Sequence, residues 1–292
     1  MTGTIAFLGT GLMGFPMASN LAQAGYRVVA WNRTTAKAAG LTTAGAEIAD
    51  TAADATAQAD LVISIVTDGS VIEALVRTCL PSLKPGTAWV DMSSTRADQA
   101  RWAAEQLAGR DVAFLDAPVS GGTKGAEAGT LAIMVGGDAP SFERAKPVLA
   151  TMGNPVHVGP TGAGQMCKLA NQAIVGITIG AVAEAQMFLE AGGVDTDAMR
   201  QALRGGFADS TILQQHGSRM KQRDFVPGGP SAIQLKDMRN VLLAADELGL
   251  TLPLVSILEA RYQRYVEEMG GGSRDHSGLF EELLDLNKKT SA

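Results

Sequence analysis

A lysine and an asparagine stand three residues apart near the start of a long apolar segment. Lys168 and Asn171 share one face if this segment is a helix. A lysine among apolar residues is unusual, because buried lysines are rare unless they are paired or functional. Removal from water would lower the pKa of its ammonium group towards neutrality, which suits a general acid or base. An ordinary exposed lysine at a helix start is the alternative.

A strand-like segment upstream ends in a proline, a serine and two glycines. The run from Asp116 to Gly122 reads Asp-Ala-Pro-Val-Ser-Gly-Gly, in which Pro118 restrains the turn. Consecutive glycines can point successive backbone N–H groups at one spot and so bind an anion, and the Ser120 hydroxyl adds a donor. We therefore predict that Ser120, Gly121 and Gly122 bind a substrate carboxylate, with a plain flexible loop as the alternative.

The chain opens with a glycine motif between a strand-like and a helix-like segment. The spacing is G-x-G-x-x-G, directly after an apolar run. The first glycine permits a tight turn, the second lets the backbone approach a pyrophosphate, and the third lets the helix pack against the sheet. The pyrophosphate would then meet the N–H groups at the start of the helix. We predict a dinucleotide site formed by Gly9, Gly11, Leu12, Met13 and Gly14, with a chance glycine-rich turn as the alternative.

The end of the second apolar run indicates which dinucleotide is preferred. NAD-binding proteins usually carry an acidic residue about 20 residues after the glycines, where it binds the ribose 2′-hydroxyl. Here the residues are Asn32, Arg33 and Thr34. Arg33 offers a planar, permanently charged group that suits a phosphate, and its two neighbours add uncharged hydrogen bonds. We predict that NADP(H) is preferred, with NAD(H) as the alternative because Arg33 can also stack on an adenine.

Two further turns follow apolar runs and are expected to touch the cofactor. Val66, Thr67 and Asp68 follow the third run, and Thr95 follows the fourth. Ligands bind at the carboxyl ends of the strands in open α/β sheets. We predict that Val66, Thr67 and Thr95 contact the cofactor, whereas Asp68 and Ser93 are equally well explained as helix caps.

The elements that must position these residues alternate in the first half of the chain. Short apolar runs, typical of buried strands, alternate with alanine-rich helical segments. This pattern predicts a parallel sheet that is covered by helices on both faces. The expected strands are 4–8, 27–31, 61–66, 88–91, 112–116 and 132–135, and the clearest helices between them are 13–24 and 99–107.

From about residue 164 the strand pattern stops. One long helix, apolar nearly all round, is predicted over 165–191, and such a helix is normally buried. It carries more apolar surface than half a small domain can cover, so we expect a second subunit to pack on it. Further helices are expected at 196–204, 210–222, 233–248 and 252–268.

The fold class is therefore α/β, with an N-terminal Rossmann domain and an all-helical C-terminal domain joined by the long helix. The predicted NADP-binding domain covers residues 1–163. Residues 164–292 are the predicted domain for substrate binding and dimerisation.

The composition limits the partners and the compartment. The 292 residues carry a net charge of −6, which argues against a nucleic-acid partner because phosphate binding needs clustered lysine and arginine. The charge-free stretch between Lys168 and Glu184 is shorter than the roughly 20 residues that span a bilayer, so no membrane partner is expected. Cys79 and Cys167 indicate reduced thiols in the cytoplasm rather than a disulfide framework. No basic region precedes the first strand, so no secretory leader is expected.

In order and spacing, three motifs resemble those of the β-hydroxyacid dehydrogenases. The motifs are the opening glycines, the run from Asp116 to Gly122, and Gly162-x-Gly164-x-x-x-Lys168-Leu169-Ala170-Asn171. That family includes 3-hydroxyisobutyrate dehydrogenase and tartronate semialdehyde reductase, and the segments 205–211 and 223–228 look closest to the second branch. The resemblance implies an active site in the cleft between the two domains. It also implies homodimers or homotetramers built through the helical domain.

The resemblance also implies roles for individual residues. Lys168 corresponds to the family's catalytic residue, and Asn171 to a residue that hydrogen-bonds the substrate. Lys236 matches a second lysine near the cofactor, and Phe225 is expected to form a wall of the cleft. One departure is the turn 65–68, which reads Ile-Val-Thr-Asp where many relatives have Met-Leu-Pro. We therefore do not assign the family's cofactor contacts at that turn to individual residues of this sequence.

These residues predict the reduction of a small semialdehyde acid, and the resemblance implies one of the tartronate semialdehyde type. NADPH would supply hydride while Lys168 protonates the forming alkoxide and Asn171 holds the oxygen. Alternatives on the same fold are a dehydrogenase of 3-hydroxyisobutyrate or L-serine, a glyoxylate or succinic semialdehyde reductase, and an imine reductase, whose members typically replace the lysine. A non-catalytic NADPH-binding module is a different class, and chromatin-associated relatives of that kind lack the lysine. No metal is expected, because His157, His216 and His276 show no metal-ligand spacing.

Overall fold

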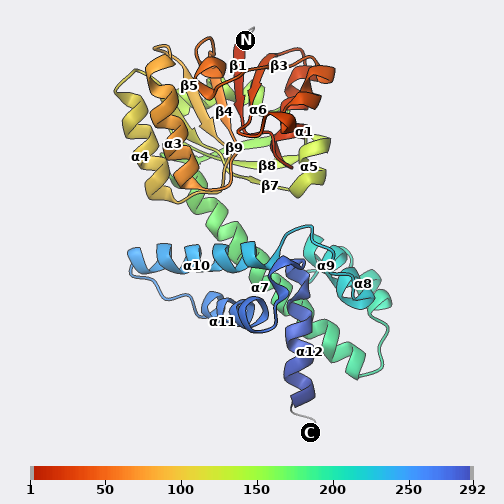
Figure 1. Cartoon of the computed structure of the whole chain (residues 1–292). Coiled ribbons are helices and arrows are strands. Elements are labelled where there is room, and N and C mark those ends of the chain that lie inside the picture. The colour runs from red at the N-terminus through yellow and green to blue at the C-terminus, as the bar shows by residue number, and fades with distance from the viewer. Residues whose placement is uncertain (1–2, 290–292) are drawn as a thin grey trace. The chain divides into compact units, whose positions relative to one another are not determined.

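Figure 1 shows the computed structural model, which describes residues 3–289. The chain forms two compact units, which divide after Lys168 within one long helix. Each unit has a hydrophobic core of its own. The predicted domain boundary, after residue 163, falls at the first residue of that helix.

The first unit is built on one sheet, whose first six strands are all parallel. The strand order is β3-β2-β1-β4-β5-β6-β8-β7, with β9 paired to β8. Its first six members have the 3-2-1-4-5-6 order of a Rossmann dinucleotide-binding sheet, as predicted. The strands are β1 (Thr4–Leu8), β2 (Arg27–Trp31), β3 (Glu47–Ile48), β4 (Leu61–Ser64), β5 (Ala88–Asp91), β6 (Ala113–Asp116), β7 (Val119–Ser120), β8 (Leu131–Gly136) and β9 (Gly153–Gly159).

Both faces of this sheet are buried. In β1, Ile5 and Phe7 belong to one core and Ala6 and Leu8 to another, because successive side chains of a strand point to opposite faces. Strands that are covered on both sides are apolar throughout, which is why they appear as continuous apolar runs in the sequence. One face is covered by α1 (Gly14–Gln23), α5 (Gly122–Ala128) and α6 (Ala139–Leu149), and the other by α2 (Ala52–Thr56), α3 (Gly69–Cys79) and α4 (Ala97–Ala108) (Figure 1).

The sheet differs from the predicted one at both edges. Strand β3 at one edge was not predicted, nor were β7 and β9 at the other, where β8 is antiparallel to β6 and β7. Strand β9 contains Gly153 and Pro155, two residue types that usually mark turns. Among the described strands β9 pairs with β8 alone, and an outer strand tolerates a proline because one side of its backbone makes no ladder hydrogen bonds.

The second unit is built from helices around a single core, as predicted. The predicted helix 252–268 ends as an α-helix at Gln263 and continues as a π-helical turn, Arg264–Glu268. The last helix, α12, was not predicted, although Leu279 and Phe280 are fully buried in the core. The helices are the second part of α7 (Ala163–Ala191), then α8 (Thr196–Leu203), α9 (Thr211–Gln222), α10 (Ser231–Glu247), α11 (Pro253–Gln263) and α12 (Leu279–Lys289).

Helix α7 combines a buried side with an exposed apolar side. By length and composition it is the one helix among residues 3–289 that is apolar enough to cross a membrane, and 33% of that apolar stretch is buried. Ile179, Val182 and Ala183 lie in the core of the second unit, which identifies α7 as a core helix. The side chains of Ile174 and Phe188 remain 65% and 77% exposed. The chain itself therefore covers only part of this helix.

Candidate active site

The glycine loop between β1 and α1 combines two packed glycines with an open one. A Cβ at Gly9 would stand 2.2 Å from the carbonyl oxygen of Ile65, and a Cβ at Gly14 would stand 1.9 Å from that of Gly9. A Cβ at Gly11 would have no atom within 4 Å. The start of α1 has no side-chain cap and no acidic residue in its first turn. The loop therefore leaves open space beside backbone N–H groups, as an anionic ligand requires.

A buried hydroxyl in this loop has no partner within the described chain. The Oγ1 of Thr10 makes no hydrogen bond among the described residues, although Thr10 is only 2% exposed. The backbone N–H of Thr10 donates to the Oδ1 of Asn32 at 3.0 Å, and the Nδ2 of Asn32 donates to the carbonyl of Thr34 at 3.0 Å. A buried polar atom without a partner is rare and fits a site completed by a ligand. Sequence reasoning missed Thr10, because the motif counts its position as any residue.

A hollow of about 670 Å³ lies beside the loop. Thr10, Gly11 and Leu12 line it on one side, and Lys37 also reaches it. Its volume falls in the range of cofactor pockets, roughly 300–1,000 Å³. Arg33 and Thr34 are exposed directly after β2. Lys37 was not predicted as a cofactor-binding residue. Its position three residues after Thr34 was the sequence feature that could have indicated it.

The turns after β4 and β5 are joined by hydrogen bonds. The N–H of Val66 donates to the Oγ of Ser93 at 2.9 Å, and Ser93 in turn donates to the Oδ1 of Asp91 at 2.6 Å. Asp68 caps α3 by accepting from the N–H groups of residues 70 and 71, so the helix-cap interpretation holds for it. Thr67 donates to the carboxylate of Asp68 at 3.1 Å. Ser93 is a buried bridge between two strand ends rather than a cap.

Asp91 is a buried carboxyl group at the end of β5. Burial raises the pKa of Asp91 to about 7, while hydrogen bonds from Ser93 and Ser64 act in the opposite direction. Ser64 also accepts a hydrogen bond from the indole Nε1 of Trp89 at 2.9 Å. The side chain of Asp91 therefore connects β4 to β5 next to the turns that are predicted to contact the cofactor.

The predicted carboxylate turn follows β7 and opens α5. Gly121 and Gly122 have φ angles of +138° and +62°, which glycine adopts without strain. A Cβ at Gly122 would meet no atom within 4 Å, and both glycines are exposed. Ser120, just before them, is half-buried. The backbone here is irregular and accessible, as an anion-binding turn requires.

The first turn of α7 is held on the end of β6. The carboxylate of Asp116 accepts hydrogen bonds from the N–H of Gly162 at 2.7 Å and the N–H of Gln165 at 2.8 Å. Burial raises the pKa of Asp116, against the effect of these hydrogen bonds. A Cβ at Gly164 would stand 2.4 Å from the carbonyl oxygen of Asp116. The Gly162-x-Gly164 pattern thus lets the helix begin directly on the strand, with half-buried Lys168 one turn further on.

Asn171 begins a chain of polar contacts in the second unit. Its Nδ2 donates to the Oε1 of Gln172 at 2.8 Å, and the Nε2 of Gln172 donates to the Oδ2 of Asp237 at 2.6 Å. A carboxylate only accepts hydrogen bonds, so Asp237 fixes the orientation of both amides and turns the Oδ1 of Asn171 away from Gln172. The ammonium of Lys236 lies 3.3 Å from the Oδ1 of Asp237. Gln172 and Asp237 were not predicted, because their contact joins residues 65 positions apart.

Phe225 is 4% exposed and lies in the core of the second unit. The guanidinium of Arg274 lies 5.4 Å from its ring centroid. The structure thus places Phe225 under the surface of its unit, and a contact with substrate stays a prediction.

In the second unit, His216 meets the consecutive residues Asp275 and His276. Candidate ligand atoms of His216, Asp275 and His276 lie within 4.8 Å of one another. The oxygens of Asp275 already accept hydrogen bonds from Ser277 and from the N–H groups of residues 228 and 229, and Arg219 lies 3.2 Å away. Burial lowers the pKa of His216 to about 4. Because the carboxylate of Asp275 is already engaged and a cation lies beside it, the cluster is better suited to structure than to a metal.

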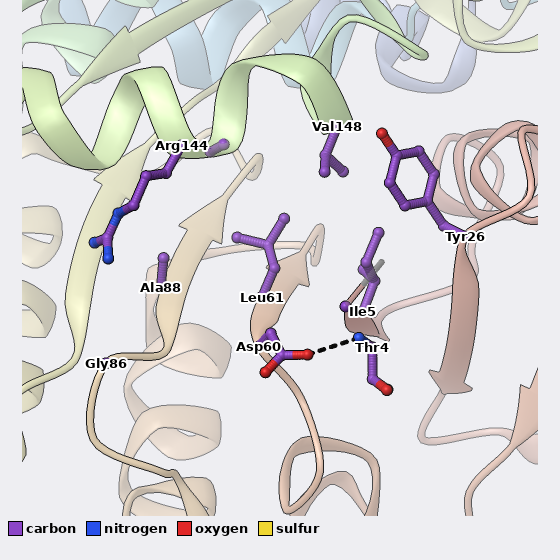
Figure 2. A pocket seen from close by; sticks show the side chains of 11 residues that line it. Thr4, Ile5, Tyr26, Asp60, Leu61, Gly86, Ala88, Arg144 and Val148 are labelled. Atoms are coloured by element: carbon purple, nitrogen blue, oxygen red, sulfur yellow. Dashed lines mark hydrogen bonds between the residues drawn. The ribbon is translucent and has the colours of Figure 1, made fainter. Parts of the chain in front are cut away.

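A smaller cavity of about 130 Å³ lies at the amino ends of the strands, at the opposite end of β1 from the glycine loop (Figure 2). Ile5, Leu61 and Val148 make much of its wall apolar, and Asp60 accepts from the N–H of Thr4 at 2.8 Å (Figure 2). None of the predicted site residues lines it. Ligands of open α/β sheets bind at the carboxyl ends of the strands, so this cavity is not the active site.

The Rossmann strand order, the open glycine loop and the orphaned Thr10 hydroxyl fit a nicotinamide dinucleotide, and they define a nucleotide-dependent oxidoreductase. Residues 4–162 match the family described as the NAD binding domain of 6-phosphogluconate dehydrogenase. Residues 162–283 match the family described as NAD-binding of NADP-dependent 3-hydroxyisobutyrate dehydrogenase. The chain therefore belongs to the 3-hydroxyisobutyrate dehydrogenase family of NAD(P)-dependent dehydrogenases and reductases, as its motifs predicted.

Individual relatives match along nearly the whole chain. The 2-hydroxy-3-oxopropionate reductase of Escherichia coli (strain K12) is 41% identical over 96% of each chain. The NAD-dependent L-serine dehydrogenase of Pseudomonas aeruginosa is 34% identical over 96% of this chain and 97% of its own. The solved structure of Mycobacterium tuberculosis 3-hydroxyisobutyrate dehydrogenase with L-serine has a TM-score of 0.89 at 32% identity, covering 97% of this chain and 99% of that one.

Proposed function

We propose that the protein reduces a small semialdehyde acid of the tartronate semialdehyde type to its hydroxy acid, with Lys168 as the general acid. One observation carries this proposal. Asp116, four residues before Ser120, accepts the hydrogen bonds that hold the start of the helix bearing Lys168. The helix that bears the ammonium group is therefore anchored at the end of β6, four residues before Ser120, where β7 ends and the turn suited to a carboxylate begins. The 41% identity to a 2-hydroxy-3-oxopropionate reductase supports the same substrate class.

Each residue has a separate role in this reaction. The bound dinucleotide supplies the hydride, which adds to the carbonyl carbon. The turn of Ser120, Gly121 and Gly122 holds the carboxylate and so limits the positions of the carbonyl group. The ammonium of Lys168 gives its proton to the carbonyl oxygen as it becomes a hydroxyl, and Asn171 hydrogen-bonds that oxygen. In the oxidation direction the neutral amine of Lys168 takes the hydroxyl proton.

The proposed cofactor preference is NADPH over NADH. No carboxylate follows β2, where NAD-binding proteins hold the ribose 2′-hydroxyl. Arg33 and Thr34 are exposed there, and Lys37 lines the hollow beside the glycine loop. Cationic side chains in this part of the chain suit a 2′-phosphate. The carboxamide of Asn32 is engaged by the loop backbone, which makes it a support for the loop.

A panel of substrates with both cofactors tests the proposed function. We expect the highest kcat/KM for tartronate semialdehyde with NADPH, above succinic and methylmalonate semialdehydes and glyoxylate. Faster oxidation of L-serine or 3-hydroxyisobutyrate with NAD would instead identify a hydroxyacid dehydrogenase. Tight NADPH binding with no turnover of any of these compounds would identify a non-catalytic module.

We further propose that the protein acts in the cytoplasm as a homodimer or homotetramer. The exposed apolar side chains of Ile174 and Phe188 on α7 support a second copy as the partner that covers this helix. Cys79 and Cys167 are free cysteines, which suits a reducing compartment. The net charge of −6 supports the absence of a nucleic-acid partner.

A further inference from the structure

The buried side chain of Gln165 joins the start of α7 to the turn after β5. Gln165 is 1% exposed. Its Nε2 donates to the carbonyl of Ser93 at 2.9 Å, and its Oε1 accepts from the N–H of Thr95 at 2.9 Å. One carboxamide therefore makes both hydrogen bonds that a neighbouring strand would make to this segment. Neither group of the turn has water as an easy substitute, because Ser93 and Thr95 are also buried.

The same helical turn is held from a second side. The N–H of Gln165 donates to Asp116, so the backbone of this residue is fixed on β6 while its side chain is fixed on the β5 turn. Gly164, next to it, has no room for a Cβ against the backbone of Asp116. The first turn of α7 thus has little freedom to shift relative to the two strand ends.

These contacts connect the predicted cofactor turns to the predicted proton donor. Ser93 accepts from the N–H of Val66, so the turns after β4 and β5 belong to one network with Gln165. Lys168 follows Gln165 by three residues, which in a helix is a rise of about 4.5 Å and a rotation that falls about 60° short of a full turn. A shift of the first turn would move the backbone of Lys168 with it.

We propose that Gln165 is a positioning residue, which holds Lys168 in register with the Thr95 turn so that proton and hydride reach the same carbonyl group. This inference rests on the proposed role of Lys168. Gln165 itself contacts neither substrate nor cofactor in this account. Its effect is on the position of Lys168 relative to the reacting carbonyl group. A misplacement of a catalytic group by about 1 Å can lower the rate on the order of 100-fold.

Gln165→Met is the first test, because methionine keeps the length and burial of the side chain and removes both hydrogen bonds. We expect kcat to fall on the order of 10- to 100-fold. We expect the KM for the semialdehyde to change much less, because the carboxylate turn at 120–122 is untouched. In the ligand-free protein the amide hydrogen of Thr95 should exchange faster with solvent deuterium, since it has lost its acceptor.

Gln165→Glu is the second test, because a glutamic acid is nearly isosteric with glutamine. Ionised, it accepts from Thr95 but places a negative oxygen against the carbonyl of Ser93; protonated, it restores both hydrogen bonds. Asp91 and Asp116 are the other acids of this network, and either one, while it is ionised, favours the protonated form of a new neighbour. The ratio of variant to wild-type kcat should rise about tenfold between about pH 8 and about pH 5.5.

Gln186→Met is the matched control. Gln186 is another fully buried glutamine of α7, and its Nε2 donates to Glu190 and Thr196 at 2.7 and 2.9 Å. Its loss should lower Tm without changing kcat or the exchange of Thr95. A folded Gln165→Met protein with wild-type kcat would overturn the inference, whether or not the exchange of Thr95 has changed.

Lys168→Met, measured beside these variants, separates the two proposals. An inactive Lys168→Met with a fully active Gln165→Met removes only the positioning role. A fully active Lys168→Met removes the proposed function, whatever Gln165 does. If Gln165→Met does not fold, the pH response of Gln165→Glu decides, and a ratio that stays flat contradicts the positioning role.

Discussion

Replacing two glycines of the opening motif separates ligand binding from packing. A Cβ at Gly14 would stand 1.9 Å from the carbonyl oxygen of Gly9, where real Cβ atoms stay beyond 3.0 Å, so α1 must move by roughly 1 Å. Overpacking of this kind costs about 1–3 kcal/mol, which lowers the Tm of a domain this size by roughly 3–10 °C. Gly11 has no atom within 4 Å of its Cβ position, so Gly11→Ala should leave the Tm of the ligand-free protein unchanged.

The same methyl group at Gly11 would occupy the space in which the backbone meets the pyrophosphate. Loss of a charge-assisted hydrogen bond there costs about 1.5–3 kcal/mol, so the Kd for NADPH should rise about 10- to 100-fold. Thermal unfolding without ligand and calorimetric titration with NADPH measure the two effects separately. If Gly11→Ala binds NADPH with wild-type affinity, the ligand does not approach this loop and the cofactor site is misplaced. Equal Tm losses for Gly11→Ala and Gly14→Ala would refute the packing argument.

Three further predictions follow from other parts of the chain. Arg33→Ala should raise the KM for NADPH about 10- to 100-fold and leave that for NADH nearly unchanged, and an unchanged NADPH value would contradict the proposed preference. The pKa of His216 is about 4 in the folded protein and 6.5 in the unfolded chain, so between these pH values the unfolded state binds the extra proton. The free energy of unfolding therefore falls as the pH drops from 6.5 to about 4, by at most about 3 kcal/mol. His216→Phe should reduce this slope in urea denaturation of the protein at several pH values, and the slope that remains is expected from His276, whose pKa is also lowered by burial. An identical slope would place the titration elsewhere. Phe188→Glu on the exposed side of α7 should reduce the mass measured by light scattering to that of a single chain, and an unchanged oligomer would show that this face is not the interface.

Local patterns predicted the elements that carry the site. The apolar runs of β1, β2 and β5 were predicted with the observed bounds, because strands buried on both faces have no polar residues to interrupt them. The long helix was predicted within two residues of its start, since residues 165–191 contain no proline and only two glycines, Gly176 and Gly180. Strand β9 was missed because Pro155 and Gly153 are turn residues in most settings.

Long-range contacts are what the patterns did not predict. Gln165 meets Ser93 and Thr95 across some 70 positions of sequence, and no local period records such a pair. The orphaned hydroxyl of Thr10 likewise becomes visible only when its surroundings are known. The sequence motif did single out Gly162 and Gly164, but the structure supplies the reasons. Gly164 packs closely on the backbone of Asp116, whereas Gly162 has a φ of +92° and donates its N–H to the carboxylate of Asp116.

Lys168→Met tests the central claim, that this side chain supplies the proton for reduction, most directly. Lys146→Met is the control, since Lys146 is an exposed lysine beside Glu143 on α6. The measurement is kcat for semialdehyde reduction with NADPH, with the Kd for NADPH determined on the same samples. We predict a kcat on the order of 10²- to 10⁴-fold lower for Lys168→Met, with NADPH affinity retained and the control unaffected. A kcat within about twofold of the wild-type value, at any pH tested, would contradict it.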